Sequence, residues 1–329
     1  MIFGQVPVTE AEGAILAHSM TLKSGVLKKG SVLDQTMLEA AVSEGISEVT
    51  VAKLESGELS EDAAAAQIGT ALTTDGLKIG RVFTGRVNLV AEKAGVVRVA
   101  AEAVSAFNAV DEGLTLATLS DYMRVSVDQL VATVKVIPYC IASTAVAKGV
   151  EALGANALSL HPFTGGVARL IMTKTDGFKD SLLAKGERIV AERIEALGFD
   201  LGETVTVPHQ EDAIAQALAE AADLHLILGA SATSDRADVA PTAVRRAGGR
   251  IERFGMPVDP GNLLFLGELR GAPVVGLPGC ARSPALNGVD WVLERLAAGL
   301  TVSSADMAAM GVGGLLKEMP GRPQPRRPR

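Results

Sequence analysis

Cysteine, aromatic residues and basic charge are all scarce in this sequence. Its 329 residues include two cysteines, aromatic residues make up 3%, and the formal net charge is −7. The cysteines, Cys140 and Cys280, are too far apart to suggest a disulfide framework or a metal-binding spacing, which favours a reducing, cytoplasmic setting. A negative charge without a basic stripe argues against nucleic acid as the main partner. The core must consist mainly of Ala, Val, Leu and Ile.

Long apolar runs are also missing. No stretch approaches the roughly 20 apolar residues that a membrane span needs, and the N-terminus lacks the basic and then apolar pattern of a secretory signal. The sequence therefore predicts neither a membrane protein nor a secreted one. Its length predicts two domains, because a single hydrophobic core rarely grows so large.

The pattern of expected elements changes about halfway along the chain. The first half is typical of an α+β domain, with a helix at 36–44 and another helix after Ser60 as its N-cap. In the second half apolar strands alternate with helices, which indicates a parallel sheet covered on both faces. We predict an N-terminal α+β domain at 1–160 and an α/β domain with a three-layer, parallel-rich sheet at 161–303. Residues 304–329 are expected to form a C-terminal extension with a disordered Pro- and Arg-rich tail.

Three loops follow predicted strands of the second domain. Loop A is residues 174–178, loop B is residues 229–238 and loop C is residues 278–283. Ligands of such sheets bind beyond the carboxyl ends of the strands, so we expect the loops to meet there. A further stretch at 255–267 contains prolines and Gly261. It is expected to lack regular strand pairing and to shape the same site.

Loop B combines small residues with carboxylates. Gly229 and its neighbours let a ligand approach the backbone, and the N-terminus of the helix that follows attracts anions. Asp235 and Asp238 would repel an anion unless a cation lay between them. Together these features suggest a phosphate-bearing ligand handled with Mg²⁺, which prefers oxygen ligands. The alternative is that Asp235 is an ordinary loop residue and Asp238 the N-cap of the helix.

Loop C is expected to place Arg282 and Ser283 at the N-terminus of a helix, with Pro284 near its first turn. Arg282 can bind a phosphate in a bidentate manner, and Ser283 adds a donor. His209 and His225 have no acidic partner at a recognisable spacing, which favours structural roles for them. The predicted catalytic and metal-binding residues are Asp235 and Asp238, and the predicted ligand-binding residues are Gly229, Ala230, Ser231, Ala232, Thr233, Ser234, Pro260, Gly261, Asn262, Pro278, Gly279, Arg282 and Ser283.

Three segments of the second half occur in the order that is typical of one family. They are GASATSDRADVAPTAV at 229–244, MPVDPGN at 256–262 and LPGCARSP at 277–284. As a set they resemble the MoaB/Mog-like molybdopterin-binding domain shared by molybdopterin adenylyltransferases and molybdopterin molybdotransferases. The sequence departs from that family where Ala230 and Ser234 replace glycines, and the second segment lacks the lysines of the molybdotransferases. The resemblance therefore implies binding of the pterin by this chain more strongly than it implies metal insertion or nucleotidyl transfer.

The resemblance implies a role in molybdenum cofactor biosynthesis and leaves the activity open. One hypothesis is a transferase that binds molybdopterin or its nucleotide form and promotes molybdate insertion, with Asp235 and Asp238 holding Mg²⁺ or molybdate. A second is a non-catalytic carrier that hands the pterin to a cytidylyltransferase domain or protein, for enzymes of the xanthine dehydrogenase type. A third is an unrelated enzyme for a phosphate-bearing small molecule, since fold does not fix function.

Relatives also imply a homo-oligomer in which the N-terminal half of a neighbouring subunit covers the cleft. Polar residues of that half, such as Asn88 and Asp111, are equally well explained by turns and helix caps. Both interpretations remain open at this point.

Overall fold

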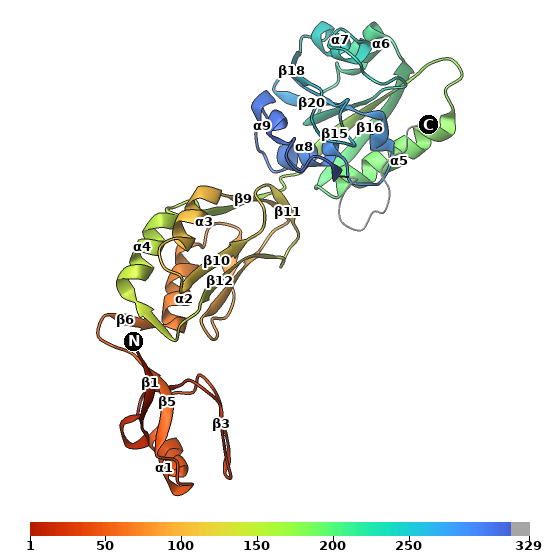
Figure 1. The fold of residues 1–329 in the computed structure, drawn as a ribbon. Coiled ribbons are helices and arrows are strands. Elements are labelled where there is room, and N and C mark those ends of the chain that lie inside the picture. The colour runs from red at the N-terminus through yellow and green to blue at the C-terminus, as the bar shows by residue number, and fades with distance from the viewer. Residues whose placement is uncertain (317–329) are drawn as a thin grey trace. The chain divides into compact units, whose positions relative to one another are not determined.

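The computed structural model describes residues 1–316, and the chain divides into two compact units, Met1–Leu160 and His161–Arg329 (Figure 1). The tail predicted to be disordered lies mostly in 317–329, outside the described residues. No helix in the described part of the chain is both long enough and apolar enough to cross a membrane.

The first unit is α+β and contains two hydrophobic cores, one built from residues between Val8 and Val51 and the other from residues between Ala64 and Leu160. The two helices predicted from the sequence are α1 (Gln35–Ser43) and α2 (Glu61–Ala71). Ser60 is the N-cap of α2, and its hydroxyl accepts a hydrogen bond from Ala63 N at 3.3 Å. Its strands are β1 (Ile2–Pro7), β2 (Ile15–Leu16), β3 (Met20–Leu22), β4 (Gly25–Leu27), β5 (Glu48–Lys53), β6 (Glu58–Ser60), β7 (Leu77–Ile79), β8 (Arg86–Ala91), β9 (Gly95–Val99), β10 (Leu114–Thr118), β11 (Met123–Val125), β12 (Leu130–Val136), β13 (Cys140–Ala142) and β14 (Leu158–Pro162), which reaches the boundary between the units. Its helices are η1 (Val8–Glu10), α1 (Gln35–Ser43), α2 (Glu61–Ala71), α3 (Ala101–Asn108) and α4 (Ser143–Leu153).

The second unit is a six-stranded sheet in the order β16-β15-β17-β20-β19-β18. The first four strands of this order are parallel, as the apolar strands alternating with helices predict. Its strands are β15 (Gly166–Lys174), β16 (Phe199–Pro208), β17 (Leu224–Leu228), β18 (Arg250–Phe254), β19 (Phe265–Leu269) and β20 (Ala272–Leu277). Its helices are α5 (Asp180–Glu195), α6 (Glu211–Ala217), α7 (Val239–Arg246), η2 (Gly279–Arg282), α8 (Gly288–Ala297) and α9 (Ser304–Ala309).

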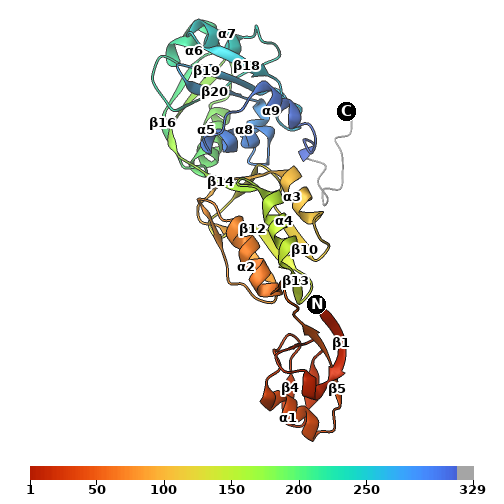
Figure 2. The same ribbon diagram turned by 90° about the vertical axis from the view of Figure 1, so that its left-hand side faces the viewer.

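Helices cover both faces of this sheet, so the unit has three layers (Figures 1 and 2). Alternate side chains of β15 enter different cores: Leu170 packs with α5, α8 and α9, whereas Ile171 packs with α6 and α7. All five residues of β17 are buried, which explains why four of them are leucine or isoleucine and why the strand does not alternate. The three-layer, parallel-rich fold predicted from the sequence is therefore present.

The prediction of an unpaired stretch at 255–267 is wrong at its C-terminal end. Phe265 begins β19, which pairs antiparallel with β20 and with β18. The Phe265 ring lies over Gly276, its cross-strand partner, where an added Cβ would be only 2.0 Å from the ring. An aromatic residue packed on a glycine stabilises strand pairing that short-range patterns do not reveal. The irregular part is therefore residues 255–264.

The C-terminal extension begins with a helix that belongs to the second unit. Ser303 caps α9 in a capping box with Asp306. Met307 within α9 is fully buried and Met310, just after the helix, is nearly so, and both lie in the core that also holds residues of α5 and α8.

Candidate functional site

The three predicted loops lie at one edge of the six-stranded sheet. Loop A follows β15, loop B follows β17 and loop C follows β20, and these three strands are neighbours. They are parallel, so their carboxyl ends lie at the same edge. Open α/β sheets bind ligands at this position.

A pocket of about 250 Å³ lies between loop B, loop C and the 255–264 segment. It is close to the small end of the range of about 300–1,000 Å³ for small-molecule sites. Six of the predicted binding residues line it: Ala232, Pro260, Gly261, Asn262, Pro278 and Gly279. Asp259, Leu263 and Cys280 complete the lining.

The 255–264 segment forms one wall of this pocket and is held in place by backbone hydrogen bonds. Met256 N donates to Asn262 O at 3.0 Å, and Gly288 N donates to Pro260 O at 2.8 Å. Gly261 has a φ of +140°, and a Cβ there would lie 2.9 Å from the backbone of Gly288. Only glycine fits at this position, which is why the wall can follow α8 so closely.

Loop B begins with a tight turn and then opens toward the pocket. A Cβ on Gly229 would lie 2.8 Å from Ser231 O, so the start of the loop requires glycine. Ser231 and Ser234 are exposed, and Thr233 is half-buried. The Ser234 hydroxyl donates to Asp238 Oδ2 at 3.3 Å, which braces the end of the loop.

Arg282 lies where the three loops meet. Its Nη2 donates to Gly229 O in loop B at 2.9 Å, and its guanidinium carbon is 5.7 Å from the ring centre of Phe178 in loop A. Its Nε is buried and has no hydrogen-bond partner within residues 1–316. Burial lowers the pKa of Arg282, but an arginine remains protonated at neutral pH. Arg282 is therefore a half-buried cation beside the start of loop B, and its charge suits an anionic ligand.

The helix N-terminus expected beside Arg282 and Ser283 lies further along the chain. Arg282 ends η2, and α8 starts only after Asn287, so Pro284 is outside the helix and that prediction is wrong. Asn287 and Asp290 form a capping box that satisfies the first N–H groups of α8. Ser283 is exposed, and its hydroxyl oxygen accepts a hydrogen bond from the backbone two residues on.

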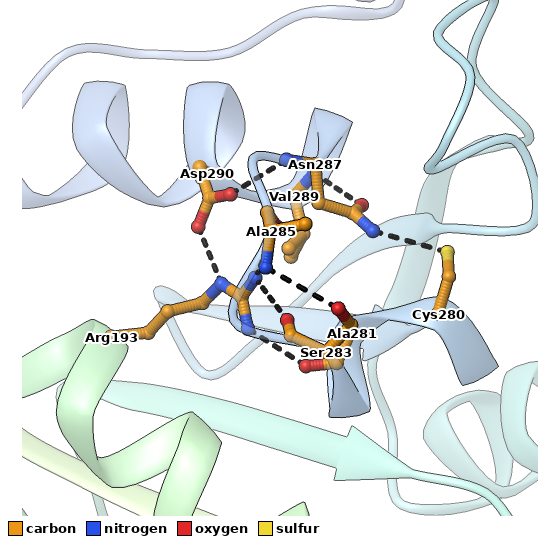
Figure 3. Close-up of polar contacts among 8 residues, drawn as sticks. All are labelled: Arg193, Cys280, Ala281, Ser283, Ala285, Asn287, Val289 and Asp290. Carbon is orange, nitrogen blue, oxygen red and sulfur yellow. Dashed lines mark hydrogen bonds and ion pairs between the residues drawn. The ribbon is translucent and has the colours of Figure 1, made fainter. Parts of the chain in front are cut away.

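Arg193 of α5 fixes loop C and the turn after it (Figure 3). Its Nη1 donates to Ala281 O at 2.7 Å, and its Nη2 donates to Ser283 O at 2.8 Å and to Ala285 O at 3.0 Å. Its Nε donates to Asp290 Oδ1 at 2.5 Å. These partners are 88 to 97 residues away in the sequence, so no local pattern points to this contact.

Cys280 borders the pocket through its thiol. Asn287, 1% exposed, donates from Nδ2 to the Cys280 Sγ at 3.1 Å (Figure 3). The same amide accepts from Val289 N at 3.2 Å. Asn287 therefore links loop C to the start of α8.

Asp238 and Asp235 are both engaged by backbone groups of the same loop and helix. Asp238 is the N-cap of α7, since Oδ1 accepts from Val239 N at 2.8 Å and Oδ2 from Ser234 N at 2.9 Å. Burial acts to raise the pKa of Asp238, but the hydrogen bonds from Ser234 and Val239 outweigh it and lower the pKa overall. Asp235 Oδ1 accepts from Ala237 N at 2.7 Å, as in an Asx turn. The sequence left open whether Asp238 caps a helix or binds a ligand, and in the structure Asp238 is the helix N-cap.

The magnesium role of Asp235 and Asp238 stays a prediction. Mg²⁺ commonly binds through one or two carboxylates, with water and substrate phosphate completing its octahedron. Within residues 1–316 there is no group of three or more His, Cys, Asp or Glu residues that could hold a metal ion. Turning Asp238 toward a cation would also give up its hydrogen bonds to the backbone.

A row of linked groups joins the ends of four neighbouring strands, and we call it the strand-end row. Thr173, at the end of β15, is fully buried, and its hydroxyl lies 2.8 Å from Nδ1 of His209, which follows β16. Ala230 N, after β17, donates to Thr173 Oγ1 at 2.7 Å. Gly229 O, beside it, accepts from Arg282 in loop C. The sequence predicts only a structural role for His209, because no spacing rule connects it to Thr173.

Two family models match parts of the chain. Residues 172–298 match the family described as a probable molybdopterin binding domain, and residues 5–53 match a domain of unknown function, DUF8806. The first match contains loops A, B and C. The second unit therefore carries a molybdopterin-binding domain of the MoaB/Mog type, as the three sequence segments imply. No curated protein matches the chain.

Solved structures of low similarity carry related titles. A molybdopterin biosynthesis moea protein from Pyrococcus horikosii is 13% identical, with 91% of this chain and 76% of that chain covered and a TM-score of 0.30. A molybdenum cofactor biosynthesis protein B is 14% identical, with 40% and 88% covered and a TM-score of 0.28. A molybdenum cofactor biosynthesis protein from Pyrococcus furiosus is 13% identical, with 94% and 65% covered and a TM-score of 0.23. Likenesses at this level assign no residue of this chain a role.

Proposed function

We propose that the second unit binds molybdopterin, or its nucleotide form, in the pocket between loops B and C. One observation carries the proposal: every residue that lines this pocket lies within the range that matches the molybdopterin-binding family. The matched domain thus has its hollow where α/β sheets bind ligands.

The chemistry of the site suits a phosphate monoester joined to a flat heterocycle. Arg282 is a cation whose guanidinium contacts the start of loop B, and guanidinium groups bind phosphate oxygens well. Pro260, Leu263 and Pro278 provide apolar surface in the pocket, against which a planar ring can pack. The phosphate would lie near Arg282 and the ring against the prolines.

The proposed role is to hold the pterin during molybdenum cofactor biosynthesis, for molybdate insertion or for transfer to a cytidylyltransferase. We favour a carrier over a transferase, because Asp235 and Asp238 are engaged by backbone N–H groups. Molybdate is then the substrate of a step that this chain assists. The molybdate-inserting transferase is the alternative, and it requires both carboxylates to leave these hydrogen bonds.

Further parts of the proposal come from the resemblance. They are a cytidylyltransferase domain or protein as partner, a recipient enzyme of the xanthine dehydrogenase type, a homo-oligomeric state and a cytoplasmic location. Cys140 and Cys280 are both free thiols, which agrees with a reducing compartment. Light scattering of the purified chain tests the oligomeric state directly.

The central experiment is an anaerobic titration of the full chain with purified molybdopterin, with and without magnesium and molybdate. Saturable binding without conversion of the pterin under any condition supports the carrier. Formation of the molybdenum-loaded pterin selects the transferase instead. Failure to bind molybdopterin, together with binding of a sugar phosphate or a nucleotide, overturns the proposal.

A further inference from the structure

The strand-end row places two polar side chains on opposite sides of the start of loop B. Gly229 and Ala230 follow β17, which is the third strand in the order β16-β15-β17-β20. Arg282 reaches Gly229 O from the β20 side. His209 lies on the other side, after β16, and Thr173 connects it to Ala230. A ligand above the end of β17 would therefore have a donor on each side.

Hydrogen-bond donors and acceptors along the row favour one tautomer of the His209 imidazole. Ala230 N–H can only donate, so Thr173 Oγ1 accepts from it at 2.7 Å. The Thr173 hydroxyl hydrogen then remains for the other close neighbour, His209 Nδ1, at 2.8 Å. With Nδ1 as the acceptor of that hydrogen, the ring proton of the imidazole is on Nε2.

The geometry leaves Nε2 as the available end of the imidazole. A Cβ on Gly229 would lie 3.7 Å from Cε1 of His209, so the ring atom that joins the two nitrogens lies near the start of loop B. Within residues 1–316 the side chain of His209 has a hydrogen bond at Nδ1 and none at Nε2. His209 is half-buried, and its backbone N donates to Lys174 O at 2.9 Å. The ring is thus fixed while one donor stays unused.

Charged groups of both signs flank the ring, the carboxylate of Asp238 and, across Gly229, the guanidinium of Arg282. Asp238 is close enough for His209 to contribute to lowering the pKa of the Asp238 carboxyl. The Asp238 carboxylate, however, already accepts from Ser234 and Val239. Arg282, on the far side of Gly229, supplies the full positive charge that a phosphate needs.

We propose that His209 is a ligand-binding residue of this site, in which Thr173 orients the imidazole so that Nε2–H donates to the phosphate oxygen of a bound phosphate monoester. Thr173 is then a positioning residue that acts through His209. This inference rests on the proposed pterin site, which it deepens by naming the group opposite Arg282.

Two substitutions of His209 separate a ligand contact from a structural one. Asn in place of His209 keeps a polar group near the Nδ1 position and can still accept from Thr173, but it has no group at the Nε2 position. Gln in place of His209 carries an amide nitrogen near the Nε2 position and gives up the contact with Thr173. We expect His209→Asn to weaken molybdopterin binding about tenfold or more, as the loss of a hydrogen bond to a charged group does. His209→Gln should stay within about threefold of the wild-type affinity, a difference below about 1 kcal/mol.

Variants of Thr173 test the positioning role. Thr173→Val removes the hydroxyl and should weaken binding, whereas Thr173→Ser should restore it. His18→Gln, at an exposed histidine of the first unit, is the matched control and should leave affinity unchanged. Thermal unfolding of every variant shows whether the fold is intact. The inference is overturned if His209→Asn binds like the wild type, or if His209→Gln binds more weakly than His209→Asn.

A second measurement on the wild-type chain does not depend on molybdopterin. With ¹⁵N-labelled histidine, the ring nitrogens of His209 should show the Nε2–H tautomer, and inorganic phosphate should shift the Nε2 signal. If molybdopterin fails to bind but phosphate shifts this signal, the proposed function fails and the inference stands. If the tautomer is Nδ1–H, or if phosphate leaves Nε2 unchanged, the inference fails even when molybdopterin binds.

Discussion

Arg193 Nε on α5 and Asp290 Oδ1 on α8 lie 2.5 Å apart, with only 10% and 16% of their side chains exposed. The same guanidinium holds three carbonyl oxygens of loop C and the turn after it. The conformation of loop C, which carries Arg282, is therefore held by an ion pair between α5 and α8 whose residues do not line the pocket.

Replacement of Arg193 by Met should destabilise the second unit strongly. It leaves Asp290 and three carbonyl groups without their partner, and breaking a buried pair typically costs about 3–5 kcal/mol. Urea unfolding measures this change. The matched control is Arg188→Met on the same helix, which removes an exposed pair with Glu192 and should cost less than about 0.5 kcal/mol. Equal effects of the two substitutions would show that Arg193 has no special role.

Replacement of Arg282 should weaken ligand binding more than it affects folding. Arg282→Lys keeps the charge but loses the planar fork, and we expect about a tenfold loss of molybdopterin affinity. Arg282→Met removes the charge as well and should cost about a hundredfold. The titration described above measures both, with the exposed Arg246→Lys as control. Wild-type affinity in Arg282→Met would exclude the phosphate contact.

Removal of divalent metal ions should leave pterin binding unchanged. Asp235 and Asp238 both accept hydrogen bonds from backbone N–H groups, so we expect EDTA and Asp235→Asn to have no effect on affinity. Asp238→Asn should keep the helix cap, whereas Asp238→Ala should lose about 0.5–2 kcal/mol of stability. Loss of binding in EDTA, restored by magnesium, would contradict this prediction and favour the metal role implied by the family resemblance.

Stability of the second unit should fall as the pH drops below about 6.5, the ordinary pKa of histidine. Desolvation lowers the pKa of His225, which is 3% exposed, and the charges of Arg169 and Arg270 lower it further. Below that pH the unfolded chain takes up a proton at His225 that the folded chain does not, so unfolding is favoured by up to about 1.4 kcal/mol per pH unit.

The variant His225→Leu removes the titrating group, whose Nδ1 has no hydrogen-bond partner within residues 1–316. The melting temperature of this variant should change less between pH 7.5 and pH 5.5 than that of the wild type. The two pH values lie about one unit above and below the ordinary pKa of histidine. The control is His18→Gln, which should keep the wild-type difference. If His225→Leu also keeps that difference, His225 is not the group responsible.

Local patterns in the sequence were sufficient for the four parallel strands of the second unit and the helices between them. Apolar runs such as β17 need burial on both faces, and the helices between them supply it. Parallel strands end at the same edge, so the meeting of loops A, B and C follows from the alternation of strands and helices alone. The Ser60 cap was predictable for the same reason, since its partner is only three residues away.

Contacts between distant residues were decided only by the tertiary structure. The antiparallel β18 and β19 depend on cross-strand packing of Phe265 on Gly276. α8 starts after Asn287 because Asn287 and Asp290 form its capping box. The sequence suggested an earlier start, with Pro284 in the first turn. The sequence itself determined that loops A, B and C follow parallel strands, because strands that alternate with helices run in one direction. The order of strands in the sheet brings together His209, Thr173 and Arg282, whose side chains meet at backbone groups of Gly229 and Ala230.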